Sequence, residues 1–496
     1  MQTLICIFNN VKVLESKEKK VETTSLWGRK SGEGLYRFLT QAPVYRVILT
    51  MAVPTIISML VTCLYNIVDT YFVGQIDTQS TAAVGVVFSL MCLIQALGAF
   101  FGQGSGSYMS RELGARRRDN ASVMAATGLV YALLVGIVVC VSGLLLLRPL
   151  SLWLGSTPTI LPYTEQYMAI ILLGAPFQIA AFALNSQLRM QGNARHAMWG
   201  IIAGALLNVV LDPVLIFVCS LGLRGAALAT VVGQIVSFLI LYIMCSRSSA
   251  SAVRLQLRRF SLRLHLVKEI VYGGSPSLSR QGLASIAVVL LNLAAADYGD
   301  AAIAAMSIVS RVTMFVMCVI VGLGQGFQPF CGYCYGAQLY KRMYQGFWFT
   351  VVTGTVFLVI VSGVVFYFAE ATVRLFRDDP IVIAVGVTTL RWQLAAYPLN
   401  AFIMTGNMML QTTRRPFRAN VLASARKGLL FIPFILILPH LFGLMGIAMC
   451  QAVCDVVTFL IAIPIVRSAF KSKKVKNLER ENEWQHTDHH QSHYYL

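Results

Sequence analysis

Long, uninterrupted apolar segments constrain the fold of this chain more than any other feature, because few structures can bury them. Each segment has more than 20 residues, enough to cross a hydrocarbon layer of roughly 30 Å as a helix that satisfies its own backbone hydrogen bonds. Only 12% of the residues are charged, about half the share found in a soluble domain. The sequence therefore predicts an all-α polytopic membrane protein with twelve transmembrane helices. The segments run over residues 47–73, 83–107, 122–147, 163–188, 197–219, 225–245, 268–293, 304–335, 346–368, 382–410, 419–439 and 444–466.

The basic residues predict how these helices are oriented. The net charge is +19, and 31 of the 40 Lys and Arg residues lie on the side that holds both termini. The turns on the opposite side hold four. Because basic loops stay in the cytoplasm, both termini are predicted to be cytoplasmic in a multi-pass protein of the inner cell membrane. The positive charge is then a topology signal, and no nucleic-acid partner is expected.

An internal repeat divides the chain into two halves. Prolines, glycines and an asparagine recur at one constant spacing, which separates Pro54 from Pro276, Gly102 from Gly324, Gly114 from Gly336, Pro176 from Pro398, and Asn185 from Asn407. We call this sequence distance the repeat spacing. One spacing kept through four helices indicates two six-helix lobes related by a parallel internal repeat. We therefore expect five parts, which are a cytoplasmic tail (1–45), an N-lobe (46–246), a basic cytoplasmic linker (247–267), a C-lobe (268–467) and a second cytoplasmic tail (468–496).

Two acids lie deep within the apolar segments of the first half, and an acid at that depth is a functional candidate. Asp69 follows Tyr65 by four residues, and Asp212 follows Asn208 by four residues, so each acid shares a helix face with a polar neighbour. Both segments run outward, which places both acids in the outer half of the membrane. We expect one shared site for a proton or Na⁺, because both cations bind oxygen and neutralise a buried carboxylate. A polar bridge that only ties the two helices together is the alternative.

Prolines and mixed polar residues predict further parts of this site. Pro54 and Pro213 each remove a backbone hydrogen bond from a helix, which creates a potential hinge. The fourth segment carries an aromatic and amide face that suits an adaptable cavity for amphipathic ligands, although ordinary helix packing explains any single member. These candidate cavity residues are Tyr167, Phe177, Gln178 and Asn185.

The second half has a different set of charges. Its main intramembrane acid is Asp455, and Arg426 lies at a similar depth when each is counted from the end of its own helix. We expect these two residues to form a structural ion pair. Arg280 competes for the same acid, and the sequence leaves both pairings open.

The chain resembles the multidrug and toxic compound extrusion (MATE) family over residues 45–467. The resemblance rests on Pro54, Asn66–Gly74, Gly102–Gly104 and Asn208–Pro213. It implies two six-helix lobes that face each other in a V, with a bend of the first helix at Pro54.

The resemblance also implies roles for individual residues. Asp69, Asn208, Asp212 and Thr230 match the cation-coupling site of the family's N-lobe, and Tyr65, Tyr167 and Asn185 match nearby cavity positions. Some branches of the family carry acids in helices 7 and 10, where this chain has Arg280 and Arg391.

The function that we expect is a secondary active multidrug efflux antiporter. It would export small amphipathic organic cations in exchange for H⁺ or Na⁺ by alternating access, as a monomer in the lipid bilayer and without a cofactor. The alternative is a flippase or exporter of a lipid-linked saccharide or another amphipathic metabolite, which would favour a basic cavity. A membrane enzyme is not expected, because no nucleophile with a base and no metal cluster is evident. The His-rich residues 486–493 suit a polar tail better than a metal site.

Overall fold

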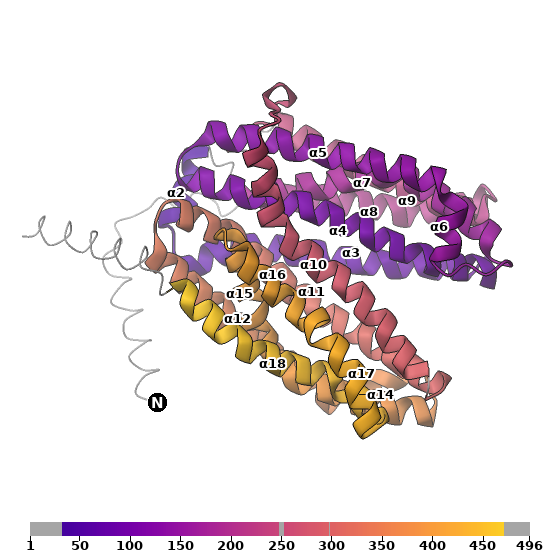
Figure 1. Cartoon of the computed structure of the whole chain (residues 1–496). Coiled ribbons are helices and arrows are strands. Elements are labelled where there is room, and N and C mark those ends of the chain that lie inside the picture. Colours follow the sequence, from indigo (N-terminus) through magenta and orange to yellow (C-terminus); the bar gives the residue numbers. More distant parts are fainter. Residues whose placement is uncertain (1–31, 248–251, 297, 471–496) are drawn as a thin grey trace, which may run out of the picture.

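The structure, a computed structural model, describes residues 32–247, 252–296 and 298–470. Within these ranges every regular element is a helix, and eleven helices are long and apolar enough to cross a membrane. Two helical bundles meet beside α2 (Gly32–Gln41) and diverge toward their opposite ends (Figure 1). This arrangement confirms the prediction of an all-α membrane protein with two lobes. The predicted His-rich tail lies outside the described residues.

The N-lobe forms the first bundle. Its helices are α3 (Val44–Gly74), α4 (Thr78–Gly114), α5 (Arg118–Leu145), the short α6 (Leu147–Trp153), α7 (Leu161–Met190), α8 (Ala194–Pro213) with the π-helical turn Val214–Val218, and α9 (Gly222–Arg247). After the turn Leu257–Arg259, the C-lobe follows. Its helices are α10 (Leu264–Ala296), α11 (Asp300–Gly336), α12 (Tyr340–Tyr367), the short α13 (Ala369–Arg374), α14 (Pro380–Ala396), α15 (Asn400–Thr412), α16 (Pro416–Ser424), the π-helical turn Ala425–Leu429, α17 (Phe431–Phe442) and α18 (Leu444–Phe470).

The tenth predicted span is not a single helix, which corrects the expectation for residues 382–410. Helix α14 ends at Ala396, and the 3₁₀ turn Tyr397–Leu399 separates it from α15. Pro398 lies in this turn, and a proline has no N–H to continue the hydrogen-bond ladder of the preceding helix. Two helices of 17 and 13 residues therefore take the place of one long span.

The contacts within the two lobes recur at the spacing seen in the sequence. The Asn185 amide donates to the carbonyl oxygen of Ala197 at 2.8 Å, and the Asn407 amide donates to that of Ala419 at 2.7 Å. The two donors are separated by the repeat spacing, and so are the two acceptors. The helices of the two lobes therefore have equivalent neighbours, as a parallel repeat requires.

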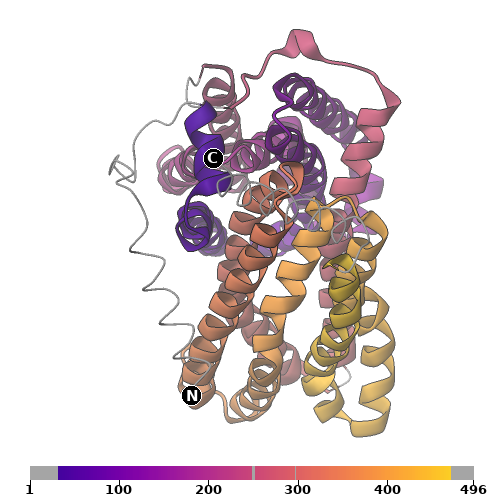
Figure 2. The same cartoon turned by 90° about the vertical axis from the view of Figure 1, so that its left-hand side faces the viewer.

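Glycines allow the two lobes to touch at the end where they meet. A Cβ atom on Gly104 of α4 would overlap the backbone of Ile270 in α10, and one on Gly326 of α11 would overlap Ala52 in α3. Near the other end of α4, a Cβ atom on Gly85 would have no atom within 4 Å. Figure 2 looks onto the meeting end, where the N-lobe helices are seen nearly end-on above the oblique C-lobe helices.

An ion cluster around a buried acid joins the lobes at the same end. Glu269 of α10, only 2% exposed, accepts from Arg111 of α4 at 2.6 Å and from Arg414 at 2.7 Å. Arg111 also donates to the carbonyl oxygen of Thr412 at 2.9 Å. We call Arg111, Glu269 and Arg414 the meeting-end cluster. The cluster is not evident from the sequence, because Glu269 directly follows a basic segment whose charges indicate topology.

The repeat supplies a neutral counterpart to Arg111. Tyr333, one repeat spacing later in the chain, donates its hydroxyl group to the carbonyl oxygen of Gln191 in the N-lobe at 3.1 Å. Each lobe thus inserts one side chain from the end of its second long helix into the other lobe. Only the Arg111 contact is ionic, so it is the stronger of the two.

Candidate functional site

Three N-lobe helices bring the predicted cation residues together. Asp69 lies near the end of α3, Asn208 and Asp212 lie one turn apart on α8, and Thr230 lies on α9. The side chains are buried, with Asp69 8% exposed and Asp212 fully enclosed. Helix α8 ends directly after Asp212, because Pro213 interrupts its ladder and the chain continues as a π-helical turn.

The two carboxyl groups meet directly inside the lobe. Asp69 and Asp212 lie within hydrogen-bonding reach of each other. Asn208 donates its amide to Asp212 Oδ1 at 3.3 Å and to the Thr230 hydroxyl oxygen at 3.4 Å. Asn208 therefore links the acid of its own helix to α9.

Three buried oxygens of this group lack a donor among the described residues, namely Asp69 Oδ1, Asp212 Oδ2 and Asn208 Oδ1. In residues 32–247, 252–296 and 298–470, neither acid forms an ion pair with Lys, Arg or His. Buried acceptors normally have a partner, and two adjacent carboxylates repel each other. A proton or a small cation between them would satisfy these oxygens and remove the repulsion.

Two tyrosines border the acids. Tyr65 precedes Asp69 by one turn of α3, and Tyr167 reaches the site from α7, where it is fully buried. Both phenol groups lie close enough to interact electrostatically with both carboxyl groups. The structure thus brings Tyr65 and Tyr167 to the predicted place beside the acids.

A small cavity lies beside the acid pair and is lined by its neighbours Tyr65, Asn208 and Thr230, but not by the acids themselves. Its volume is about 60 Å³, which holds several water molecules or a hydrated cation, whereas pockets for drug-sized ligands begin near about 300 Å³. Gln178 lines it, with an Oε1 atom that has no donor within the described chain. The other lining residues are Thr62, Tyr65, Ala181, Phe182, Ile201, Gly204, Ala205, Asn208, Thr230, Gly233, Gln234 and Ser237.

Two predicted cavity residues lie elsewhere. Asn185 comes two helical turns after Gln178, so its side chain reaches the start of α8 at Ala197 and accepts from Arg189 at 3.2 Å. Phe177 packs its ring against Phe238 at 5.7 Å. Neither residue lines this small cavity, and their place in a larger substrate cavity stays a prediction.

The two predicted hinge prolines have different surroundings. Helix α3 continues through Pro54 without interruption. Pro54 lies between Ala52 and Ile56, the residues that pack against Gly326 and Gly322 of α11. A bend at Pro54 would therefore occur where α3 leaves its contact with the C-lobe. Pro213 instead marks a change from α-helix to π-helix beside Asp212.

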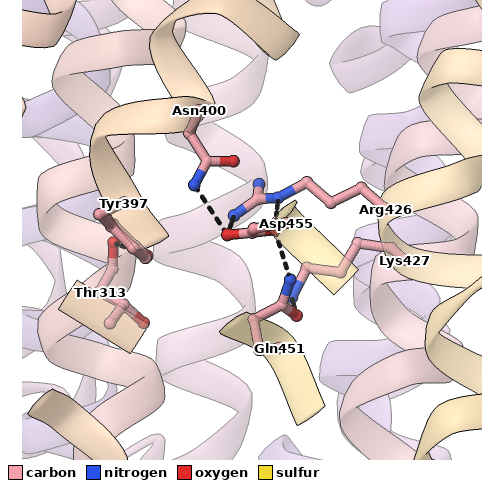
Figure 3. A network of polar contacts seen from close by, with 7 residues as sticks. All are labelled: Thr313, Tyr397, Asn400, Arg426, Lys427, Gln451 and Asp455. Atoms are coloured by element: carbon pink, nitrogen blue, oxygen red, sulfur yellow. Dashed lines mark hydrogen bonds and ion pairs between the residues drawn. The ribbon is translucent and has the colours of Figure 1, made fainter. Parts of the chain in front are cut away.

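The C-lobe holds a separate polar network, drawn in Figure 3. Arg426 Nε donates to Asp455 Oδ1 at 2.8 Å, and Arg426 Nη2 donates to Asp455 Oδ2 at 3.3 Å. Arg280 does not compete for this acid, because it donates to Asn407 Oδ1 at 3.0 Å and to Ser277 at 3.4 Å. The structure thus brings together Arg426 and Asp455, and places Arg280 with an amide.

Two further members of the C-lobe network, Asn400 and Gln451, were not predicted from the sequence. Asn400 donates to Asp455 Oδ2 and Gln451 donates to Asp455 Oδ1, both at 2.8 Å. Lys427 donates to Gln451 Oε1 at 2.8 Å. Signals for both were present, since Gln451 precedes Asp455 by one helical turn and Asn400 lies one repeat spacing after Gln178.

No metal centre is found in the described ranges, where no three His, Cys, Asp or Glu residues are grouped to hold an ion.

Known proteins resemble this chain in sequence and in fold. The family model MatE matches it twice, over residues 54–214 and 276–437, and the two matches begin at the paired prolines Pro54 and Pro276. The multidrug export protein MepA of Staphylococcus aureus is 29% identical over 439 residues, covering 88% of this chain and 96% of that protein.

Solved structures match over nearly the same length. An outward-facing multidrug resistance MATE family transporter of the MOP superfamily has a TM-score of 0.84 at 25% identity, covering 92% of this chain and 100% of that one. A MOP superfamily transporter from Pyrococcus furiosus also has a TM-score of 0.84 at 25% identity, covering 90% of this chain and 100% of that one. It is described as having a binding pocket of reverse polarity that suggests a different function. The chain therefore belongs to the MatE family of membrane transporters.

Proposed function

We propose that this transporter is a secondary active multidrug antiporter that exports amphipathic organic cations in exchange for H⁺ or Na⁺. The observation that carries the proposal is the direct meeting of Asp69 and Asp212 without a basic partner among the described residues. Such a pair binds one positive charge more readily than none, because the cation relieves carboxylate repulsion in a medium of low dielectric constant. A proton, Na⁺ and the charged end of a substrate then compete for the same oxygens.

The size of the cavity supports a binding mode in which the charged group and the apolar part of the substrate lie in different places. Only its charged group fits in about 60 Å³, so the apolar part has to lie outside the cavity, between the lobes. No cofactor takes part in this exchange, and a single chain supplies both lobes, so we propose that the monomer is the working unit.

The proposed orientation follows the positive-inside rule. With the basic side in the cytoplasm, the diverging ends of the lobes face outward, as in the related transporter described as outward-facing. Reporter fusions after residue 40 and after residue 470 are expected to be cytoplasmic, and a fusion near Asp378 is expected to be external. An external reporter after residue 470 would contradict the orientation.

A hinge at Pro54 would couple the cation site to the lobe contact. Pro54→Ala restores the missing backbone donor and stiffens α3 between the Gly326 contact and Asp69, so we expect unchanged substrate binding and a turnover several-fold slower. Binding of a fluorescent cation and its transport rate are measured on the same purified protein. Wild-type turnover in this variant would show that α3 does not need to bend.

The second candidate is export or flipping of a lipid-linked saccharide or another amphipathic metabolite. The Pyrococcus furiosus transporter supports considering it, because its pocket polarity was taken to suggest a different function. A pyrophosphate group would be repelled by Asp69 and Asp212, so the N-lobe acids favour the cationic substrate.

Flux in proteoliposomes tests the proposed function. The purified protein is reconstituted, and efflux of a fluorescent organic cation is followed with a pH gradient or a Na⁺ gradient imposed separately. We expect one of the two gradients to drive accumulation against the substrate gradient. Equal, non-accumulating flux under both gradients would reject antiport, and movement of a lipid-linked saccharide would favour the second candidate.

A further inference from the structure

The repeat allows the N-lobe cavity to be compared position by position with the C-lobe. The same hydrogen bond occurs in both lobes, from Asn185 to Ala197 and from Asn407 to Ala419. At the repeat spacing, α7 therefore corresponds to α14 and α15, and the start of α8 corresponds to the start of α16. Gly225 and Gly446 each approach the backbone of the preceding segment, at Leu215 and Leu438, so α9 corresponds to α18 at a spacing shorter by one. Leu215 and Leu438 themselves are separated by one residue more than the repeat spacing, so the C-lobe segment that holds the π-helical turn Ala425–Leu429 contains one extra residue. Equivalent segments can therefore be assigned across both lobes.

This comparison places the C-lobe network on the residues that line the N-lobe cavity. The part of α8 that contains Gly204 and Ala205 corresponds to the π-helical turn that carries Arg426 and Lys427. On the remaining helices, Gln178, Thr230 and Gln234 correspond to Asn400, Gln451 and Asp455. The same position in the two lobes is thus a cavity in one and a charged cluster in the other.

The two acid sites differ in how their oxygens are satisfied. Asp455 Oδ1 accepts from Arg426 and Gln451, and Asp455 Oδ2 accepts from Arg426 and Asn400. The side chain of Asp455 is only 1% exposed. Asp69 and Asp212, in contrast, each keep one buried oxygen without a donor in the described part of the chain. An exchangeable cation has ligands to bind in the N-lobe, whereas at Asp455 it would have to displace a bidentate guanidinium group.

We propose that Arg426 is a tethered counter-ion, which permanently neutralises Asp455 and excludes an exchangeable cation from it. As a consequence, Asp455 does not respond to H⁺ or Na⁺, and the N-lobe acids alone couple transport. The coupling part of this inference rests on the proposed antiport, but the exclusion of cations from Asp455 does not. Arg426 is therefore a residue that determines how many cations move in each cycle.

The first test measures thermal stability and needs no transport. In a background of Asp69→Asn and Asp212→Asn, the change Arg426→Gly with Lys427→Ala replaces both charged residues of the π-helical turn by the small residue types that line the N-lobe cavity. We expect the Tm to fall by roughly 5–10 °C, because Asp455 is left buried and uncompensated. The Tm should rise again at lower pH, where Asp455 gains a proton, and with Na⁺ or millimolar methylguanidinium. Adding Asp455→Asn should restore the Tm and abolish all three responses.

Two control variants show whether the responses are specific to the loss of Arg426. Arg280→Gln removes another arginine of the C-lobe, one that contacts an amide and a hydroxyl group, and it should create no response to pH, Na⁺ or methylguanidinium. The background itself, with Arg426 intact, should also show no response to Na⁺. If the Arg426→Gly variant lacks these responses, or if Asp455→Asn does not restore its Tm, Arg426 is not a counter-ion.

A second, size-preserving variant covers the case in which the first does not fold. Arg426→Gln with Asp455→Asn removes both charges and keeps polar side chains, so the number of cations moved per substrate should equal that of the wild type. A folded double variant with lost or reduced coupling would overturn the proposal. If the wild-type chain shows no ion-coupled flux at all, the proposed function fails, and the Tm measurements still decide whether Arg426 blocks cation binding.

Discussion

Asp69→Asn and Asp212→Asn are each expected to abolish gradient-driven export while the protein stays folded in the membrane. Asparagine keeps the shape of the side chain but cannot carry the exchangeable charge, so the imposed gradient no longer acts on the substrate. Each unit of pH gradient supplies about 1.4 kcal/mol per proton, which sustains a tenfold substrate gradient. The expected loss is therefore about tenfold in accumulation for every unit of pH gradient.

Accumulation of a fluorescent cation in proteoliposomes measures this loss. Asp378→Asn is a suitable control, because Asp378 is an acid with a side chain 78% exposed, outside both polar sites. It should transport as the wild type does. Wild-type coupling in both N-lobe variants would mean that another group carries the charge.

Glu269→Gln is expected to open the end where the lobes meet. The substitution leaves Arg111 and Arg414 without their counter-charge, while the backbone contacts at Gly104 and Gly326 remain. Removing one partner of a buried ion pair costs several kcal/mol, and a change of about 1.4 kcal/mol shifts a conformational equilibrium tenfold. We expect at least a tenfold increase in the population that is open at this end.

Native thiol groups report this opening. Cys331 and Cys334 are fully buried next to Gly332 and Tyr333, which contact Ser110 and Gly114 of the other lobe. Their labelling by a membrane-impermeant maleimide, followed by mass spectrometry, should become at least tenfold faster in Glu269→Gln. Cys450 and Cys454, buried within the C-lobe, serve as internal controls. Unchanged labelling of all four cysteines would show that the cluster does not hold the lobes together.

The parts of the fold that follow from the membrane as a solvent were predictable from the sequence. A chain in hydrocarbon has to form helices of a fixed minimum length, so the spans and the two lobes could be predicted. Asp69 and Asp212 stood out because acids are rare at that depth. The break at Pro398 was not predicted, since its counterpart Pro176 lies within the continuous helix α7. Sequence position alone does not tell which proline interrupts a helix.

The sequence left helix depth and the choice of partners open. Asn185 lies two turns away from Gln178 and binds the start of α8, and it does not line the small N-lobe cavity. Arg280 and Arg426 were both plausible partners of Asp455, and only the packing of α16 to α18 distinguished them. Glu269 was not predicted as a contact residue, because charged residues near a basic cytoplasmic segment look the same in the sequence whether they are exposed or lie between the lobes. These features depend on distances between helices, which the repeat does not supply.

Cation release on substrate binding tests most directly whether the driving ion and the substrate share the N-lobe acids. Tetraphenylphosphonium is added to the purified protein in weakly buffered detergent solution, and the released H⁺ or ²²Na⁺ is measured together with bound probe. Because coupling between two ligands is reciprocal, we expect about one cation released for each probe bound by the wild type. The variant with Asp69→Asn and Asp212→Asn should release none. Tight binding of the probe to the wild type without release of either cation would contradict the account.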